Sequence, residues 1–227
     1  MIAALLGTAL LAQAANPAAQ PVPSVDVEAR VPGKASVWLA GSSPSAIAGW
    51  YVDGSGSRRY DQMPNCGPTK IALRPGMTSF TVVTSNGEVR IADEIGTEAY
   101  GPAGDLKRTV PRNRDQSYRG PIGEVAAPIG GLMGVYLPEV SADHPADQSR
   151  WQVGRVAIGQ KAVAPRLYIP FYIGIGRTSD NTPVVFNVPK GAATLYLGVM
   201  GQTAWAKHEG QYDVVLKFET PKRPIGG

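Results

Sequence analysis

The residues best suited to binding chemistry lie in one stretch near the C-terminus, residues 201–210, with the sequence GQTAWAKHEG. It holds Trp205, one of four tryptophans, and His208, one of two histidines, between two segments that alternate as β-strands do. Loops on a β scaffold commonly carry the residues with which a domain binds its ligand. This stretch is therefore the first candidate for a binding site.

Motifs for nucleophilic or metal-dependent catalysis do not occur in the sequence. There is no G-x-S-x-G and no H-E-x-x-H, and Cys66 with two distant histidines is a poor match to zinc-ligand spacing. Residues 53–64 begin like a calcium loop, but Arg58 stands where glycine is required and Pro64 where a bidentate glutamate is required. We therefore expect a protein that is not an enzyme and needs no cofactor and no metal.

Glycoside hydrolysis by two carboxylates is the catalytic alternative that the sequence leaves open. The distance between two carboxylates in space decides that chemistry, and a sequence does not reveal it. The cluster to consider is Asp93, Glu94, Glu98 and Asp105. Acidic residues in polar loops are more commonly solvated than catalytic.

The charge of the chain is modest, with 22 Lys and Arg against 18 Asp and Glu and a net charge of +4. The basic residues are densest in the segment 107–119, in which Asp115 is the only acid. Such a segment could bind an acidic polysaccharide or envelope phosphates, or it could be a solvated loop. Its only aromatic residue is Tyr118, so a nucleic-acid partner is not expected.

The N-terminal residues 1–14 are apolar and end in Ala-Gln-Ala, which predicts a cleavable signal peptide. They are too few to span a bilayer, and a buried N-terminal helix is the alternative. We expect a periplasmic or secreted protein without stable membrane insertion. The predicted organisation is a signal peptide (1–14), a linker (15–24), one β domain (25–220) and a disordered tail (221–227).

The composition favours a fold of short strands and turns, because 27 Gly and 20 Pro are spread along the chain. The segment 78–93 contains Asn86-Gly87, which predicts a hairpin, and residues 94–130 are expected to be long loops. A short helix is possible at 143–153. Together these features predict an all-β chain, a single antiparallel β-sandwich of jelly-roll type with long loops. The other predicted strands are 131–138, 167–174, 183–189, 193–200 and 211–218.

The C-terminal third carries a series of short motifs: Phe-Tyr-Ile-Gly-x-Gly at 171–176, Val-Pro-x-Gly-Ala at 188–192, Leu-Tyr-Leu-Gly at 195–198, and Gly-x-Tyr-x-Val at 210–214. In these motifs the chain resembles an exported bacterial β-sandwich family related to the PA-I type of galactose-binding, calcium-dependent lectin. Segments 31–41, 72–83 and the YGPAGD stretch at 100–105 extend the resemblance over most of the chain.

The resemblance implies a binding loop at 201–209, but the calcium ligands of that lectin type are replaced. Gly201, or Met200 in a neighbouring register, stands at the position of the first aspartate, and Lys207 and His208 stand at those of two asparagines. A lysine cation beside the ion disfavours calcium, which takes several oxygen ligands. We therefore expect no calcium in this loop.

Two interpretations of the loop remain open. In the first, the chain is a non-catalytic carbohydrate-binding protein, with Lys207 in place of the ion and Trp205 as a stacking face for a glycan or acidic polysaccharide. In the second, the lectin site has decayed, Trp205 packs onto the sandwich, and the chain is a structural or protein-interaction domain of the cell envelope. The residues of the first interpretation are Trp205, Lys207, His208 and Glu209, with Tyr100, Asp105 and Gln116 from the facing loop.

Overall fold

The computed structural model describes residues 23–43, 66–92, 97–110, 122–139, 152–201 and 205–220. Within these ranges the chain is all-β, as the sequence predicts, with short 3-10 turns and no helix long or apolar enough to cross a membrane. The predicted signal peptide and tail lie outside the described residues, and the predicted linker ends where β1 begins. The elements are β1 (Ser24–Pro32), η1 (Val37–Leu39), β2 (Thr69–Ala72), β3 (Ser79–Ala92), β4 (Thr97–Tyr100), β5 (Asp105–Val110), β6 (Glu124–Ile129), β7 (Leu132–Leu137), β8 (Gln152–Arg155), β9 (Ala162–Val163), β10 (Phe171–Tyr172), β11 (Val185–Asn187), β12 (Thr194–Val199), η2 (Trp205–Lys207) and β13 (Glu209–Glu219).

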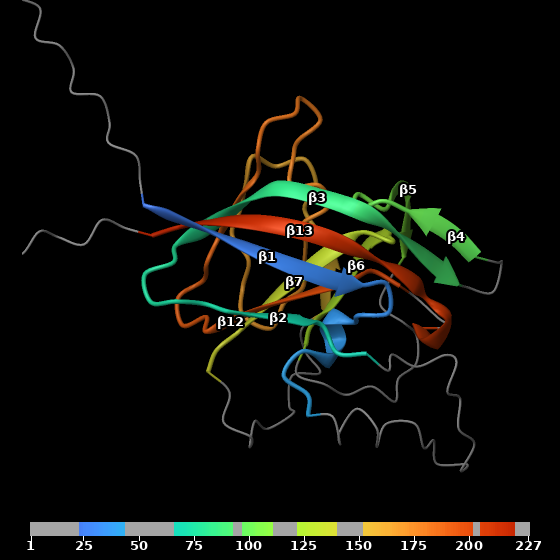
Figure 1. The fold of residues 1–227 in the computed structure, drawn as a ribbon, viewed down its shortest axis with the longest axis horizontal. Coiled ribbons are helices and arrows are strands. Elements are labelled where there is room, and N and C mark those ends of the chain that lie inside the picture. The colour runs from blue at the N-terminus through green and yellow to red at the C-terminus, as the bar shows by residue number, and fades with distance from the viewer. Residues whose placement is uncertain are drawn as a thin grey trace, which may run out of the picture.

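The described strands form a β-sandwich whose main sheets are antiparallel. The larger sheet has the order β1-β13-β3-β11-β9, with β4 also paired to β3, and the second sheet has the order β10-β7-β12-β2. A third, smaller sheet joins β5, β6 and β8. Only the short pairs β11–β9 and β6–β8 are parallel among these. In Figure 1 the long strands β1, β13 and β3 lie side by side across the molecule, and β4 and β5 gather at one end.

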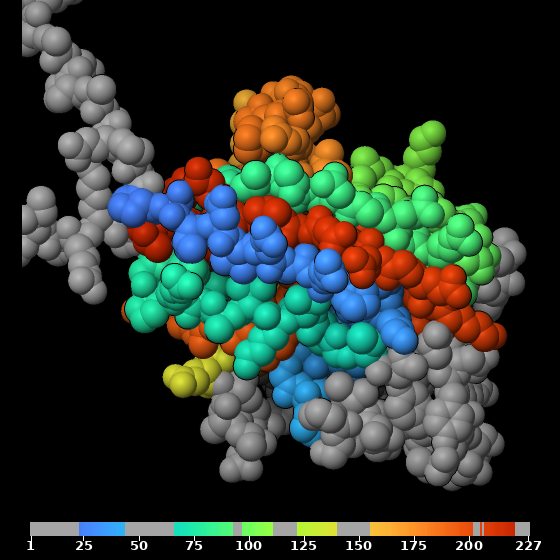
Figure 2. Space-filling model, viewed as in Figure 1, coloured from blue at the N-terminus to red at the C-terminus, as the bar shows by residue number. Residues whose placement is uncertain are grey.

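Strand β13 has one buried and one wet face, as its sequence alternation predicts. Tyr212, Val214, Leu216 and Phe218 are buried, while residues between them face solvent. On the wet face Asp213 lies opposite Arg30 of β1, and the Arg30 Nε is 3.3 Å from its carboxylate. This exposed ion pair contributes little to stability. Most of the exposed positions of β1, β13 and β3, three strands that lie side by side in Figure 2, are polar.

The predicted hairpin at Asn86-Gly87 is wrong, because β3 runs straight through it. The strand pairs with β13 on both sides of Gly87, which lies opposite Tyr212. Glycine is needed there for another reason: its φ is +98°, and a β-carbon would lie 2.3 Å from the Gln211 carbonyl oxygen. The long ladder with β13 thus overrides the local preference of Asn-Gly for a turn.

A β-bulge at Val83 divides β3 into two parts that bury different positions. Val215 pairs with Thr84 and Leu216 with Val82, so Val83 has no partner on β13. The extra residue changes which positions face the core. Phe80 and Val82 are buried before it and Val89 and Ile91 after it, a switch from even to odd positions.

The long loop expected at 94–130 is also wrong in part. It contains the strands β4, β5 and β6, and the YGPAGD stretch is the turn between the first two, closed by a bond from the Gly104 amide to the Gly101 carbonyl (2.8 Å). These strands are short and lack clear alternation, so their pairing partners decide their structure. The possible helix at 143–153 lies mostly outside the described residues, and its last two positions, 152 and 153, belong to β8.

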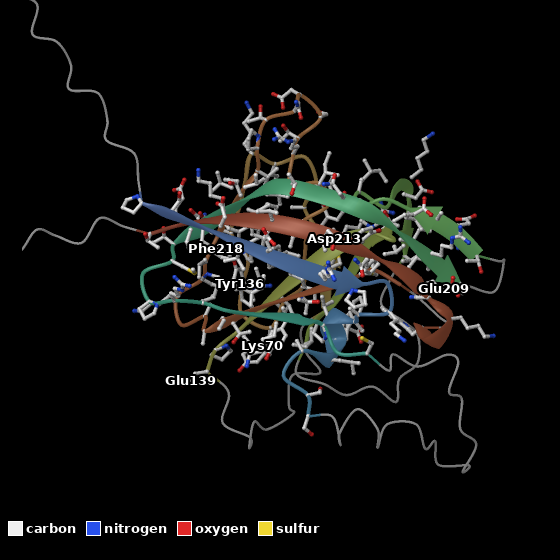
Figure 3. All side chains as sticks on the ribbon, in the orientation of Figure 1. Lys70, Tyr136, Glu139, Glu209, Asp213 and Phe218 are labelled. Carbon is white, nitrogen blue, oxygen red and sulfur yellow. The ribbon has the colours of Figure 1, made fainter. Side chains whose placement is uncertain are left out.

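The core between the two main sheets is centred on aromatic rings. Phe80 of β3 stacks on Phe186 of β11 at 4.8 Å, and Phe186 meets Phe171 of β10, in the opposite sheet, at 5.8 Å between ring centroids. Figure 3 shows Tyr136 and Phe218 among the side chains of this region. The turn η1 covers β12, where a β-carbon at Gly198 would lie 2.7 Å from the Ala35 carbonyl oxygen.

Replacing Gly87 by alanine should destabilise the protein strongly. The new β-carbon would combine the strain of a positive φ, about 1 kcal/mol, with a clash against the backbone of β13, and we expect a total loss of about 3 kcal/mol. Gly159→Ala is the matched control, because Gly159 has φ +78° but open space around it. Urea unfolding of both variants measures the difference, and equal losses would contradict the clash.

Candidate functional site

Three of the described residues of the 201–209 loop, Gly201, Trp205 and His208, are buried at the end of the sandwich. Trp205, in η2, is only 1% exposed, and its ring meets the edge of Trp38 of η1 at 6.2 Å and 76°. Its other ring neighbour is His208, at 5.0 Å. An aromatic ring that stacks on a sugar needs one face open to water. Trp205 has none, so the stacking role of the first interpretation is wrong, and the ring packs onto the sandwich as in the second.

His208 is also buried, at 3% exposure, and belongs to the same cluster. Its Nε2 lies 3.2 Å from the carbonyl oxygen of Ala92, at the end of β3. A carbonyl oxygen only accepts hydrogen bonds, so Nε2 carries the hydrogen in this contact. The prediction that His208 lies at the exposed rim of a binding site is therefore also wrong. Its ring is buried and bonds the loop to β3.

Gly201 has no room for a calcium-binding side chain. It stands where the resembling lectin type has its first aspartate, but a β-carbon there would lie 2.5 Å from His208 Cε1 and 3.2 Å from the ring of Trp205. The neighbouring Lys207 is an exposed cation. Among the described residues no group of three or more His, Cys, Asp and Glu comes together. In the described part of the loop, the enclosed Gly201 and the cation of Lys207 therefore disfavour a calcium ion.

Two of the predicted residues do reach the surface at this end. Lys207 and Glu209 are exposed, and Glu209 lies opposite Arg90 of β3. Figure 3 shows Glu209 at the end of β13. Tyr100 pairs with Val89, the neighbour of Arg90, so β4 brings it to the same end of the sheet.

Tyr100 is held in a polar cluster that the sequence analysis did not find. Its hydroxyl donates to the Glu98 carboxylate, whose Oε2 also lies 3.2 Å from Arg108 Nη1. Burial, and then the bond and charge of Glu98, raise the pKa of Tyr100 to about 12, against the lowering effect of Arg108. The three residues lie on β4 and β5. The sequence would have revealed that they meet only if both strands had been predicted.

The remaining predicted positions contribute less to a common site. One oxygen of the Asp105 carboxylate accepts a hydrogen bond from the Lys107 amide (2.8 Å), within the same strand. Residues 111–119 of the basic segment, Gln116 among them, lie outside the described residues. Cys66 is half-buried, and burial raises the pKa of its thiol, which disfavours the reactive thiolate.

No family model, curated protein or solved structure matches this chain. The resemblance to the PA-I lectin type therefore stays a hypothesis that rests on short motifs.

Truncating the buried tryptophan should unfold the protein more easily. Trp205→Ala removes a large enclosed ring, and we expect a loss of about 3–5 kcal/mol in the free energy of unfolding. Lys207→Ala is the matched control in the same turn, with an expected change within about 0.5 kcal/mol. Denaturant titration measures both, and a Trp205→Ala variant as stable as the control would contradict the packing described.

High pH should destabilise the protein through its buried tyrosines. Burial raises the pKa of Tyr172 to about 12, from an ordinary value of 10.0, and also raises that of Tyr212. A raised pKa means that the folded state holds its proton after the unfolded state has lost it, so stability is full below pH 10 and falls up to about pH 12.

Tyr172 alone should account for roughly 2–3 kcal/mol of this loss. Urea unfolding between about pH 9 and pH 12 measures the profile. Tyr172→Phe has no phenol to ionise, so its stability should fall less steeply with pH than that of the parent chain. Parallel profiles for the two proteins would contradict the assignment.

Proposed function

We propose that this chain is a non-catalytic structural or protein-interaction domain of the cell envelope, and that its 201–209 loop stabilises the sandwich. The observation that carries the proposal is the burial of Trp205 between Trp38 and His208. The loop is the one that the lectin resemblance identifies as the binding loop, but its aromatic ring, Trp205, is buried in the packing of the sandwich. Export to the periplasm or the medium is part of the proposal, on the strength of the N-terminal sequence.

The surroundings of the acidic residues support a role without catalysis. Glu98 is bonded to Tyr100 and Arg108, and one oxygen of Asp105 accepts the Lys107 amide. A glycosidase needs one carboxylate free to attack or to activate water and another free to protonate the leaving group. Asp93 and Glu94, the other members of that cluster, lie outside the described residues.

Metal-free carbohydrate binding is the second candidate, favoured by the exposed polar residues at the same end. Lys207 and Glu209 could contact sugar hydroxyls there, with Tyr100 on the neighbouring strand. Because Trp205 is enclosed in the sandwich, such a site would rely mainly on polar contacts, and its affinity would be low and would depend on Lys207.

A glycan array with the purified chain separates the candidates when it is run with calcium and with chelator. The structural or protein-interaction role predicts no glycan binding in either condition. Binding that survives chelation and is lost in Lys207→Ala would overturn that role and establish the second candidate. Binding that requires calcium would contradict both, because it would need a metal site that Gly201 cannot support.

A further inference from the structure

A small apolar pocket lies away from the 201–209 loop, between β5, the residues after β10 and the segment 157–163. Its volume is about 210 Å³. The orange segment that rises above β3 in Figures 1 and 2 belongs to this part of the chain. The apolar residues that shape it are Leu106, Ile158, Ile173, Ile175, Val184 and Phe186.

The pocket has a buried floor and an exposed apolar mouth. Ile173, Val184 and Phe186 are at most 6% exposed, whereas Leu106, Ile158 and Ile175 are 56%, 45% and 44% exposed. The last three account for most of the large apolar side chains exposed on the described surface. Apolar groups gathered around a concave site favour the burial of an apolar ligand.

Hydrogen bonds hold the walls of the pocket in place. The Tyr172 hydroxyl donates to the Ala103 carbonyl (2.8 Å) and so joins the β10 side to the β4–β5 turn. The Val184 amide donates to the Gly176 carbonyl (2.9 Å), and the Val185 amide to that of Lys161 (3.0 Å). The concavity is therefore formed before any ligand arrives, which lowers the cost of binding.

Arg177 is the charged side chain among the residues that line the pocket. Its Nη1 donates to the Asn181 carbonyl (3.0 Å), which orients the guanidinium and leaves further N–H groups for a ligand. Close by, Lys161 and Asp180 lie 3.9 Å apart and balance each other. The local charge is therefore positive, and guanidinium groups bind carboxylates well.

The volume limits what the pocket can take. A cavity of about 150 Å³ holds benzene, and drug-sized ligands need about 300 Å³ or more. With about 210 Å³, the pocket fits one ring or a short alkyl chain. We propose that it binds small amphiphilic carboxylates, with the apolar part on Phe186 and Ile173 and the carboxylate at Arg177. This site is independent of the role proposed for the chain as a whole.

Phenylacetate and uncharged 2-phenylethanol are suitable probes, titrated into the full chain and followed by ligand-observed NMR. Phenylacetate should bind the more tightly. Arg177→Gln should weaken phenylacetate by roughly tenfold or more, because it removes a charge-assisted hydrogen bond, and should change 2-phenylethanol by less than about twofold. Arg166→Gln, an exposed arginine outside the pocket, is its control and should change neither probe.

The mouth is tested by Ile175→Glu, which should weaken both probes because it puts a carboxylate beside the apolar floor. Val83→Glu is the matched control, since Val83 and Ile175 are both 44% exposed and only Ile175 lines the pocket. Thermal unfolding establishes that the variants fold. The proposal is overturned if phenylacetate does not bind at millimolar concentration, if Arg177→Gln leaves its affinity unchanged, or if Val83→Glu weakens it as much as Ile175→Glu.

Discussion

The hydroxyl group of Tyr212 ties together one whole end of the molecule. It lies 2.6 Å from the carbonyl oxygen of Gly130, 2.9 Å from that of Gly101 and 3.1 Å from that of Tyr100. A hydroxyl donates one hydrogen, and the nearest acceptor is Gly130. The carbonyl oxygens at the turn between β4 and β5 lie close to the same hydroxyl, and the bond to Gly130 fixes β13 to the turn between β6 and β7. Two hydrogen bonds join the latter turn to Met200: the Gly130 amide donates to the Met200 carbonyl (2.7 Å), and the Met200 amide donates to the Gly131 carbonyl (2.9 Å). The start of the 201–209 loop therefore depends on the same contacts.

With the start of the loop fixed there, Trp205 and His208 are buried in the sandwich end. Trp38 and Trp205 bring their rings edge to face, and neither indole N–H has a hydrogen-bond partner within the described part of the chain. An unpaired buried donor costs about 1–3 kcal/mol. The burial of two large rings, at about 1.5–3 kcal/mol or more for each, offsets that cost. The balance is one of apolar packing, and a ligand that had to expose Trp205 would lose it.

The sequence predicts what local patterns control and fails where distant pairing decides. The alternation from Tyr212 to Phe218 identified β13 and its buried face, because a half-buried strand must alternate. Asn86-Gly87 led to a wrong hairpin prediction, because the strand is held by its ladder with β13, and the paired residues are more than a hundred positions apart in the sequence. The residue types of the 201–209 loop drew attention to this end of the molecule. They did not reveal that Trp205 would pack against Trp38, which lies far away in the sequence. Likewise, Glu98 and Arg108 meet only because β4 and β5 exist.

The same topology explains why the open pocket lies elsewhere. β9, β10 and β11 have only two or three residues each, so few ladder bonds order this part of the sandwich. The chain turns there through Gly174 and Gly176, both with positive φ, and a β-carbon on Gly176 would lie 2.3 Å from Val82. Ile175, between these two glycines, is 44% exposed and lines the pocket. Two of the exposed apolar side chains around the concavity, Ile158 and Ile175, lie beside these short strands, and Leu106 of β5 is the third, with Arg177 next to them. In the described part of the chain, the capacity to bind an apolar group therefore lies at these short strands and not in the 201–209 loop.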